Sequence, residues 1–301
     1  MTTLETTVFS DNKNGGNPCP LIFDYGNLST DQMLKITKYF GFESVFISES
    51  LKEDAEYRFR YFVPNHEMEM CVHATIAGVT FLAKNNLIKK NNIEIETLLG
   101  NITIKLKQNI DHSILITVNQ FAPKFSQNNP SKKEVAECLN ISQEIIDTTD
   151  FPIQSVSTSR PKLIIPIIND EQLHNLDPNF KTLWALCESY NTTGFYPFSL
   201  QTKNQNYDFE ARQFPNNVGY NEDPATGVAA CALGAYLTKY SKKINFNNKE
   251  ITIGQGKALD RSSKIMVKTS TNKTLTTTEV SGYAKIIDKK TLPNKAYNLC
   301  R

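Results

Sequence analysis

The sequence lacks the motifs of most cofactor-dependent and metal-dependent enzymes. It holds no GxGxxG, no GxxxxGK[ST], no HExxH and no GxSxG. The segment Gly254-Gln255-Gly256 is a lone GxG, which is too common to indicate a nucleotide site. Nothing calls for a nucleotide, a flavin or a serine hydrolase mechanism, and we predict that the protein uses no cofactor.

Strong charge and long apolar runs are also absent. The net charge of +2 over 301 residues gives no support to nucleic-acid binding. The longest apolar runs, such as Leu163–Ile168, are strand-sized, and the N-terminus lacks the basic and apolar parts of a signal peptide. The six cysteines are scattered without a CxxC pair, which is typical of free thiols in a reducing compartment. We therefore expect a cytoplasmic protein without a membrane or nucleic-acid partner.

Two segments, residues 73–82 and 223–237, have little polar surface on any side. A helix that is apolar all round must be enclosed. Short strand patterns separated by turn residues lie around both segments. The sequence therefore predicts an α+β fold of two pseudo-symmetric domains, each a curved, mostly antiparallel, barrel-like sheet around a central apolar helix.

An Ala-Thr pair opens each apolar segment, about half a chain apart, which favours an old duplication over a short-period solenoid. We expect the first domain to comprise residues 1–119 with the C-terminal segment 289–301, and the second to comprise residues 120–288. Two such domains facing each other would leave a cleft, and clefts between domains are common ligand sites.

The second apolar helix opens at Asp223-Pro224-Ala225-Thr226-Gly227. The simpler interpretation is that Asp223 is only the N-cap of this helix, since a proline suits the first helical position. Gly227, however, stands where a good helix former is expected. The small Ala225 and Thr226 leave bare N–H groups at the positive end of the helix, where a carboxylate or an oxyanion can bind.

The first apolar helix opens at Met70-Cys71-Val72-His73-Ala74-Thr75. A helix N-terminus favours the thiolate form of Cys71, and His73 is a candidate proton-transfer group. The alternative is that Cys71 is a small buried residue and His73 is a helix cap. With no further ligand at suitable spacing, the two residues give an incomplete zinc set, and we predict no metal site.

Glu43 lies within Phe40-Gly41-Phe42-Glu43-Ser44-Val45-Phe46. A carboxylate buried among three phenylalanines would have a raised pKa, which suits a general acid or base. The alternative interpretation is an exposed glutamate in a turn.

Taken together, these segments resemble the PhzF-like (phenazine-biosynthesis-like) isomerase family, which shares a duplicated fold with diaminopimelate epimerase. The resemblance covers essentially the whole chain. Its segments are Val8-Phe9, Gly16-Asn17-Pro18, Glu43-Ser44-Val45-Phe46, Arg60-Tyr61-Phe62-Val63-Pro64, Glu67, Cys71-Val72-His73-Ala74-Thr75, Arg212-Gln213-Phe214-Pro215, Gly219, Glu222-Asp223-Pro224-Ala225-Thr226-Gly227, Gln255-Gly256 and Arg261-Ser262.

The resemblance implies a cofactor-independent isomerase or epimerase that moves a proton on a small carboxylate metabolite bound between two halves, often as a homodimer. It implies catalytic roles for Glu43, His73 and Asp223, with Glu43 as the proton carrier. The substrate-binding residues that it implies are Asn17, Pro18, Val72, Ala74, Thr75, Thr226 and Gly227.

The chain also departs from the family pattern. Val72 stands where the family often has glycine, and valine resists positive φ. Phe42 replaces a frequent serine before the glutamate. Cys71 occupies the place that resembles the first thiol of the epimerases, and Asp223 lies near the second. An amino-acid racemase or epimerase based on Cys71 and Asp223 is therefore an alternative, and a non-catalytic small-molecule-binding relative is a third.

Overall fold

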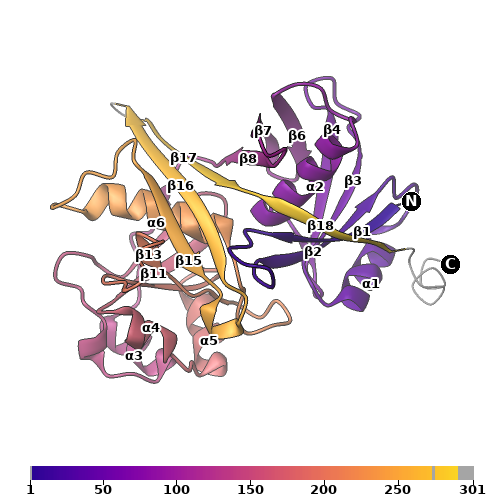
Figure 1. Cartoon of the computed structure of the whole chain (residues 1–301). Helices are drawn as coiled ribbons and strands as arrows, with labels where there is room; N and C mark the ends of the chain where they lie inside the picture. The colour runs from indigo at the N-terminus through magenta and orange to yellow at the C-terminus, as the bar shows by residue number, and fades with distance from the viewer. Residues whose placement is uncertain (1, 273–274, 291–301) are drawn as a thin grey trace. The chain divides into compact units, whose positions relative to one another are not determined.

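The computed structural model describes residues 2–272 and 275–290, which divide into two compact units (Figure 1). Unit 1 is Met1–Asn119 with Ser281–Arg301, and unit 2 is Gln120–Val280. The chain returns to unit 1 at Ser281, before residue 289 where the sequence predicted the return. The reason is strand β18, which pairs with β1 and so belongs to the first sheet. Residues 291–301 of the predicted segment, with Cys300, lie outside the described residues.

Unit 1 holds one mixed sheet in the strand order β8-β7-β6-β4-β3-β2-β1-β18, with β5 paired to β4. Two neighbouring pairs, β2 with β3 and β4 with β6, are parallel, and the other pairs are antiparallel. The strands are β1 (Thr2–Val8), β2 (Asn17–Phe23), β3 (Ser44–Glu49), β4 (Tyr57–Phe62), β5 (Glu67–Met68), β6 (Asn92–Thr97), β7 (Gly100–Gln108), β8 (Ile114–Asn119) and β18 (Ala284–Lys290).

Helix α2 (Val72–Lys84) is enclosed by this sheet, as its apolar sequence predicted. It contacts β8 and β18, which stand at opposite ends of the strand order, as well as β1, β2 and β3, so the sheet curves around it. Gly78 permits this close packing, because a Cβ there would lie 2.5 Å from a ring carbon of Phe59. The curved sheet around a central apolar helix is confirmed in unit 1.

Helix α1 (Thr30–Phe40) places Glu43 at a junction. Ser29 and Gln32 form a capping box, and Gly41 at φ 73° ends the helix in the left-handed conformation. β3 begins three residues after Gly41, at Ser44. Glu43 is therefore held between a well-defined helix end and a buried strand.

Unit 2 contains two sheets, in the strand orders β14-β12-β11-β10-β9 and β13-β15-β16-β17. Its strands are β9 (Lys124–Phe125), β10 (Gln154–Ser157), β11 (Pro161–Ile167), β12 (Gly194–Ser199), β13 (Phe209–Glu210), β14 (Phe214–Pro215), β15 (Glu250–Gln255), β16 (Ser263–Asn272) and β17 (Leu275–Gly282). Its α-helices are α3 (Lys132–Leu139), α4 (Asp170–His174), α5 (Phe180–Ser189) and α6 (Gly227–Tyr240).

Helix α6 is the buried helix of unit 2. It contacts β16 of one sheet and β10 and β11 of the other, so it lies between the two sheets. Its residues from Gly227 to Leu237 are all buried, which confirms the predicted enclosed helix. Helices α3 and α5, which the sequence interpretation did not include, contribute to a separate apolar cluster with Leu163, Ile165 and Phe195. None of the described helices is both long and apolar enough to cross a membrane.

Candidate active site

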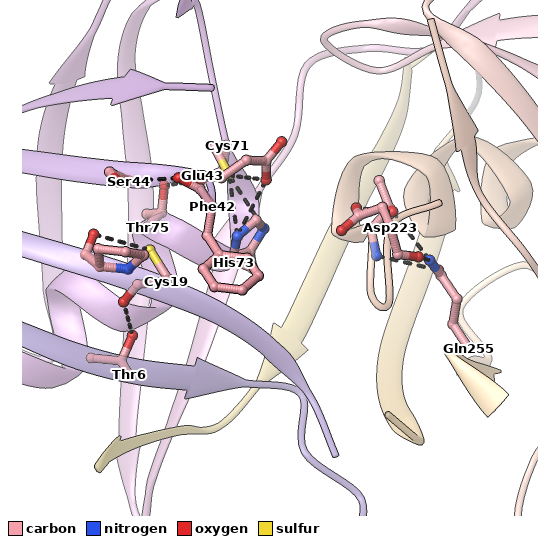
Figure 2. Close-up of polar contacts among 12 residues, drawn as sticks. Thr6, Cys19, Phe42, Glu43, Ser44, Cys71, His73, Thr75, Asp223 and Gln255 are labelled. Carbon is pink, nitrogen blue, oxygen red and sulfur yellow. Dashed lines mark hydrogen bonds and ion pairs between the residues drawn. The ribbon is translucent and has the colours of Figure 1, made fainter. Parts of the chain in front are cut away.

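Glu43, Cys71 and His73 meet at the start of α2 in unit 1 (Figure 2). Oε2 of Glu43 lies 3.2 Å from Nε2 of His73 and 3.5 Å from Sγ of Cys71. The same sulfur lies 3.3 Å from Nδ1 of His73. The structure therefore brings the predicted carboxylate, thiol and imidazole into one cluster within a single unit.

One protonation pattern satisfies all three groups. Burial lowers the pKa of His73, and the negative charge of Glu43 opposes this effect only in part. A neutral imidazole protonated on Nε2 donates a hydrogen bond to Glu43 and accepts a hydrogen bond from the Cys71 thiol at Nδ1. The imidazole can thus relay a proton between the thiol and the carboxylate.

The structure decides between the simple interpretations of these residues. His73 is not a cap, because it is the second residue of α2 and 3% exposed. Cys71 is 5% exposed, so the expectation of a small buried residue holds for it, and at the N-cap position its side chain makes no capping hydrogen bond. The side chain of Glu43 is 14% exposed, so an exposed turn glutamate is also wrong. Each of the three side chains is held at the cluster rather than at the surface.

The surroundings of Glu43 are less apolar than its flanking phenylalanines predicted. Phe46 is fully buried, but Phe42 is 47% exposed. The carboxylate therefore meets His73 and Cys71 on one side instead of a closed shell of three rings. The charge of Glu43 also acts on the buried thiol of Cys19, whose pKa is raised mainly by burial and, to a smaller degree, by this charge.

Two further contacts fix the backbone of the cluster. The carbonyl of Cys71 accepts from the backbone N–H of Thr75 at 3.0 Å and from its hydroxyl at 2.8 Å. The buried Tyr61 hydroxyl lies 2.7 Å from the same Thr75 hydroxyl. Thr75, a predicted substrate-binding residue, is fully buried and makes these structural contacts. Tyr61 was not singled out as a site residue, and only its place in the family-like segment marks it in the sequence.

The remaining predicted residues of unit 1 occupy ordinary backbone conformations. Val72 is the first residue of α2 and lies outside the positive-φ set, so valine fits where glycine was expected. Asn17 is buried at the start of β2, next to the partly buried Pro18. Gly16 before them has φ 89°, and a Cβ there would approach the Thr7 hydroxyl to 2.5 Å. The substrate-binding roles of Asn17, Pro18, Val72 and Ala74 stay predictions.

In unit 2, Asp223 is not the N-cap of its helix. α6 begins at Gly227 with Thr226 as N-cap, and the Asp223 carboxylate accepts a hydrogen bond from the Thr226 hydroxyl. The Asp223 backbone pairs instead with Gln213 in an isolated bridge. The bridge and the hydroxyl contact hold this carboxylate just before the buried helix. Its catalytic role and the ligand roles of Thr226 and Gly227 stay predictions.

Gln255 fixes both ends of this turn. Its Nε2 donates to the Asp223 carbonyl at 2.7 Å, and its Oε1 accepts from the Thr226 N–H at 3.2 Å (Figure 2). The Tyr196 hydroxyl donates to the same Oε1 at 3.2 Å. Gly256 has φ 82°, and a Cβ there would lie 2.6 Å from the Pro224 carbonyl oxygen. Gln255 thus holds the turn by hydrogen bonds, and Gly256 leaves room for the turn to approach.

A buried ion pair holds Glu222, the residue directly before Asp223. The Arg212 guanidinium donates to both carboxylate oxygens of Glu222, at 3.0 and 2.7 Å. It also donates to the carbonyls of Leu173, His174 and Leu176. Arg212 and Glu222 lie ten residues apart, and this spacing alone does not predict an ion pair between them.

A carboxylate, an imidazole and a thiol thus meet at the start of an enclosed helix, and groups of these kinds can accept, hold and donate protons. The sequence matches the family described as phenazine biosynthesis-like protein (PhzC-PhzF) over residues 6–289. The chain belongs to this family, as the resemblance predicted.

Individual relatives agree with this assignment. The chain is 28% identical to the uncharacterized isomerase YfhB of Bacillus subtilis, over 94% of this chain and 92% of that protein. It is 30% identical to antisense-enhancing sequence 1 of Schizosaccharomyces pombe, over 92% and 94% of the two chains. The predicted isomerase class is supported by several relatives that carry this name.

Solved structures agree with the fold. A PhzF-family phenazine biosynthesis protein of Bacillus anthracis has a TM-score of 0.87 at 26% identity, covering 97% of this chain and 99% of that one. A hydroxyproline epimerase of Agrobacterium vitis has a TM-score of 0.68 at 9% identity, over 96% and 91% of the chains. At that identity the likeness shows the fold alone. The predicted epimerase-like fold is confirmed.

Proposed function

We propose that the protein is a cofactor-independent isomerase or epimerase in which Glu43 carries a proton between two positions of a small carboxylate substrate. The observation that supports this most is the contact of 3.2 Å between the Glu43 carboxylate and the buried His73 imidazole. The imidazole N–H orients the carboxylate, as a positioned general base requires.

The proposed step is balanced within the substrate and Glu43. The ionised Glu43 takes a proton from a carbon next to an acidifying group, and the electron pair of the C–H bond moves into that group as an enolate. In an isomerisation Glu43 then returns the proton to another carbon. In an epimerisation a second acid, for which we propose Asp223, protonates the same carbon from the opposite face, and Glu43 later releases its proton to the solvent. No oxidant, metal or cofactor enters this balance.

The starts of α2 and α6 suit the negative charge of such a substrate. The N-cap side chains of α1, α3, α4 and α5 bond the first turns of their helices, whereas Cys71 and Thr226 do not. The N–H groups in the first turns of α2 and α6 are therefore without a side-chain cap, and a helix N-terminus favours a carboxylate or an enolate oxygen. We assign this role to the N–H groups of Val72 and Ala74 in α2 and of Gly227 in α6.

The family resemblance extends the proposal to the rest of the molecule. It supports a substrate held between the two halves, with Asp223 as a second acid or base and Asn17, Pro18, Thr75 and Thr226 as further lining. It also supports a homodimer. A cytoplasmic location is supported by the five described cysteines, all of which are free thiols.

The proposal is tested by deuterium exchange over a panel of small hydroxy- and amino-carboxylates. In deuterated water the wild-type protein is expected to place deuterium on a carbon of at least one compound, detected by mass spectrometry. Glu43→Gln keeps the shape of the side chain and is expected to lose the exchange. Glu49→Gln is the matched control, because Glu49 is an exposed residue of the same region at the end of β3.

Retained exchange in Glu43→Gln would reject Glu43 as the proton carrier. Binding of panel compounds without any exchange by the wild-type protein would instead favour the non-catalytic relative.

A second candidate is a racemase or epimerase in which Cys71 takes the α-proton of an amino acid and Asp223 serves the opposite face. The contact of 3.3 Å between the Cys71 sulfur and Nδ1 of His73 favours it, because the imidazole can accept the thiol proton. Cys71→Ser separates the two candidates. It should abolish exchange at the α-carbon in a thiol mechanism and retain exchange when Glu43 is the carrier.

A further inference from the structure

The contacts among Glu43, Cys71 and His73 also describe a set of metal ligands. The three residues each offer one donor atom, and these atoms all lie within 4.8 Å of one another. The sequence alone supplies only two donors at the helix start, Cys71 and His73. The third, Glu43, comes from the junction between α1 and β3, and only the fold brings it to the other two.

Two of the three separations are close to the edges of a metal coordination polyhedron. Zinc bonds of about 2.0–2.3 Å at tetrahedral angles place neighbouring donor atoms about 3.3–3.6 Å apart. The carboxylate oxygen lies 3.2 Å from Nε2 of His73 and 3.5 Å from Sγ of Cys71. One ion can bond only one nitrogen of the imidazole, and Nε2 lies 4.0 Å from the sulfur. Shortening this third separation by about 0.5 Å would place one ion among Sγ, Nε2 and the carboxylate oxygen.

We propose that Glu43, Cys71 and His73 form a binding site for a thiolate-preferring divalent ion of the Zn²⁺ type, with a fourth coordination position left open. A thiolate and an imidazole select such ions over Mg²⁺ and Ca²⁺, which prefer oxygen ligands. Three protein ligands and an open position are the arrangement of accessible zinc sites. On binding, the Cys71 thiol releases its proton to the solvent and the sulfur bonds the metal. The imidazole carries its single proton on Nδ1 in this state, which leaves the Nε2 lone pair for the metal.

The surroundings hold the donors in place for this role. The backbone of Cys71 is fixed by the Thr75 N–H and hydroxyl, which both donate to its carbonyl. Glu43 is confined between the end of α1 and the start of β3. Both arrangements reduce the conformational freedom that the ligands would lose on binding the ion.

The consequence for activity rests on the proposed function. A metal ion occupies the Glu43 oxygen and the imidazole nitrogen that the proposed proton transfer needs. The ion is therefore an inhibitor that competes with proton transfer, and not a cofactor. The open fourth position is where the carboxylate of a substrate or a water molecule completes the coordination.

The site is tested with Co²⁺ as a spectroscopic probe, on the full chain after treatment with a chelator. Co²⁺ titration of the reduced wild-type protein is expected to produce a thiolate-to-cobalt charge-transfer band that Zn²⁺ abolishes and Mg²⁺ does not. Cys71→Ser should lose the band. Glu43→Gln and His73→Asn should keep a thiolate but weaken Co²⁺ binding at least about tenfold.

Matched controls separate the site from other thiols and surface groups. Cys138→Ser removes a buried thiol of unit 2, Glu49→Gln an exposed carboxylate and His112→Asn an exposed imidazole. These three variants should bind Co²⁺ as the wild type does, and circular dichroism confirms that every variant is folded.

Absence of the band in the wild type, or its persistence in folded Cys71→Ser, would overturn the metal site. Wild-type affinity in both Glu43→Gln and His73→Asn would overturn it as well. The titration needs no substrate, so such a result leaves the proposed isomerase untouched. Conversely, a failure of Glu43→Gln to lose exchange rejects the proposed function without affecting the cobalt result.

Discussion

Replacing Arg212 by methionine should strongly destabilise unit 2. The Arg212 side chain is 8% exposed and that of Glu222 is 9% exposed, and the two form a bidentate ion pair. Methionine keeps most of the volume but leaves the Glu222 carboxylate buried without its partner. It also leaves the carbonyls of Leu173, His174 and Leu176 without this donor. Breaking a buried pair in this way costs about 3–5 kcal/mol.

The single tryptophan makes this cost measurable in the correct unit. Trp184 lies in α5 of unit 2, where its indole N–H donates to the Pro215 carbonyl at 3.1 Å. Urea unfolding followed by tryptophan fluorescence therefore reports on unit 2. We expect the midpoint of Arg212→Met to fall by the equivalent of about 3–5 kcal/mol, with an unchanged slope.

Three comparisons identify the cause. Arg212→Lys keeps the charge but loses the bidentate geometry, so it should destabilise unit 2 by a smaller amount, about 1–3 kcal/mol. The double variant Arg212→Met/Glu222→Met leaves no stranded charge and should be more stable than Arg212→Met alone. Lys133→Met, at an exposed position of α3, is the control and should change little. A loss below about 1 kcal/mol in Arg212→Met would refute the reasoning.

Two further changes test the turn that carries Asp223 and the start of α4. Gly256→Ala should destabilise unit 2 by about 2–4 kcal/mol in the same fluorescence assay, from positive-φ strain and overpacking. The reason is that its Cβ would lie 2.4 Å from the Arg261 carbonyl oxygen. Gly26→Ala, at φ 60° with open space in unit 1, is the control and should leave this unit 2 signal unchanged; equal losses would contradict this. The Lys203 N–H, which donates to the Asp170 carboxylate at 2.9 Å, lowers the pKa of Asp170. The stabilisation from the ionised Asp170 is therefore present above its unfolded-state pKa and is lost as the pH falls through its lowered folded-state pKa. The urea midpoints of wild type and Asp170→Asn should differ at neutral pH and converge in acid. A difference between the midpoints that widens in acid would contradict a lowered pKa.

Features that depend on local sequence could be predicted. The bounds of α1 follow from Ser29, a capping residue, and Gly41, a left-handed terminator, each of which can be recognised from its neighbouring residues. The enclosed helices were found because residues 73–82 and 223–237 carry little polar surface. α3 was missed although Ser131 and Glu134 form a capping box before it, so its signal was present in the sequence.

Features that depend on long-range packing could not be predicted. Residues 276–287 read as one strand, but the structure ends β17 at Gly282 and starts β18 at Ala284. A Cβ at Gly282 would lie 2.4 Å from the ring of Phe9, which itself has φ 63°. The strand break therefore depends on a residue from the other end of the chain, and no local pattern shows it.

The same distinction between local sequence signals and long-range packing applies to the residues of the site. The positions of Cys71 and His73 follow from one helix start, but Glu43 reaches them only because β3 and β2 bring its junction beside α2. Asp223 was taken as a possible cap because aspartate before proline is common at a helix start. Its backbone bridge to Gln213 moves the helix start to Gly227, and a partner ten residues upstream has no local signature.

The central claim is that Glu43 carries the proton. The most direct measurement compares wild type, Glu43→Gln and Cys71→Ser on one carboxylate that the wild-type protein exchanges in deuterated water, with binding followed by thermal shift. Glu43→Gln is expected to bind the compound but to incorporate no deuterium, while Cys71→Ser continues to exchange. Deuterium incorporation by Glu43→Gln at the wild-type rate would contradict this claim.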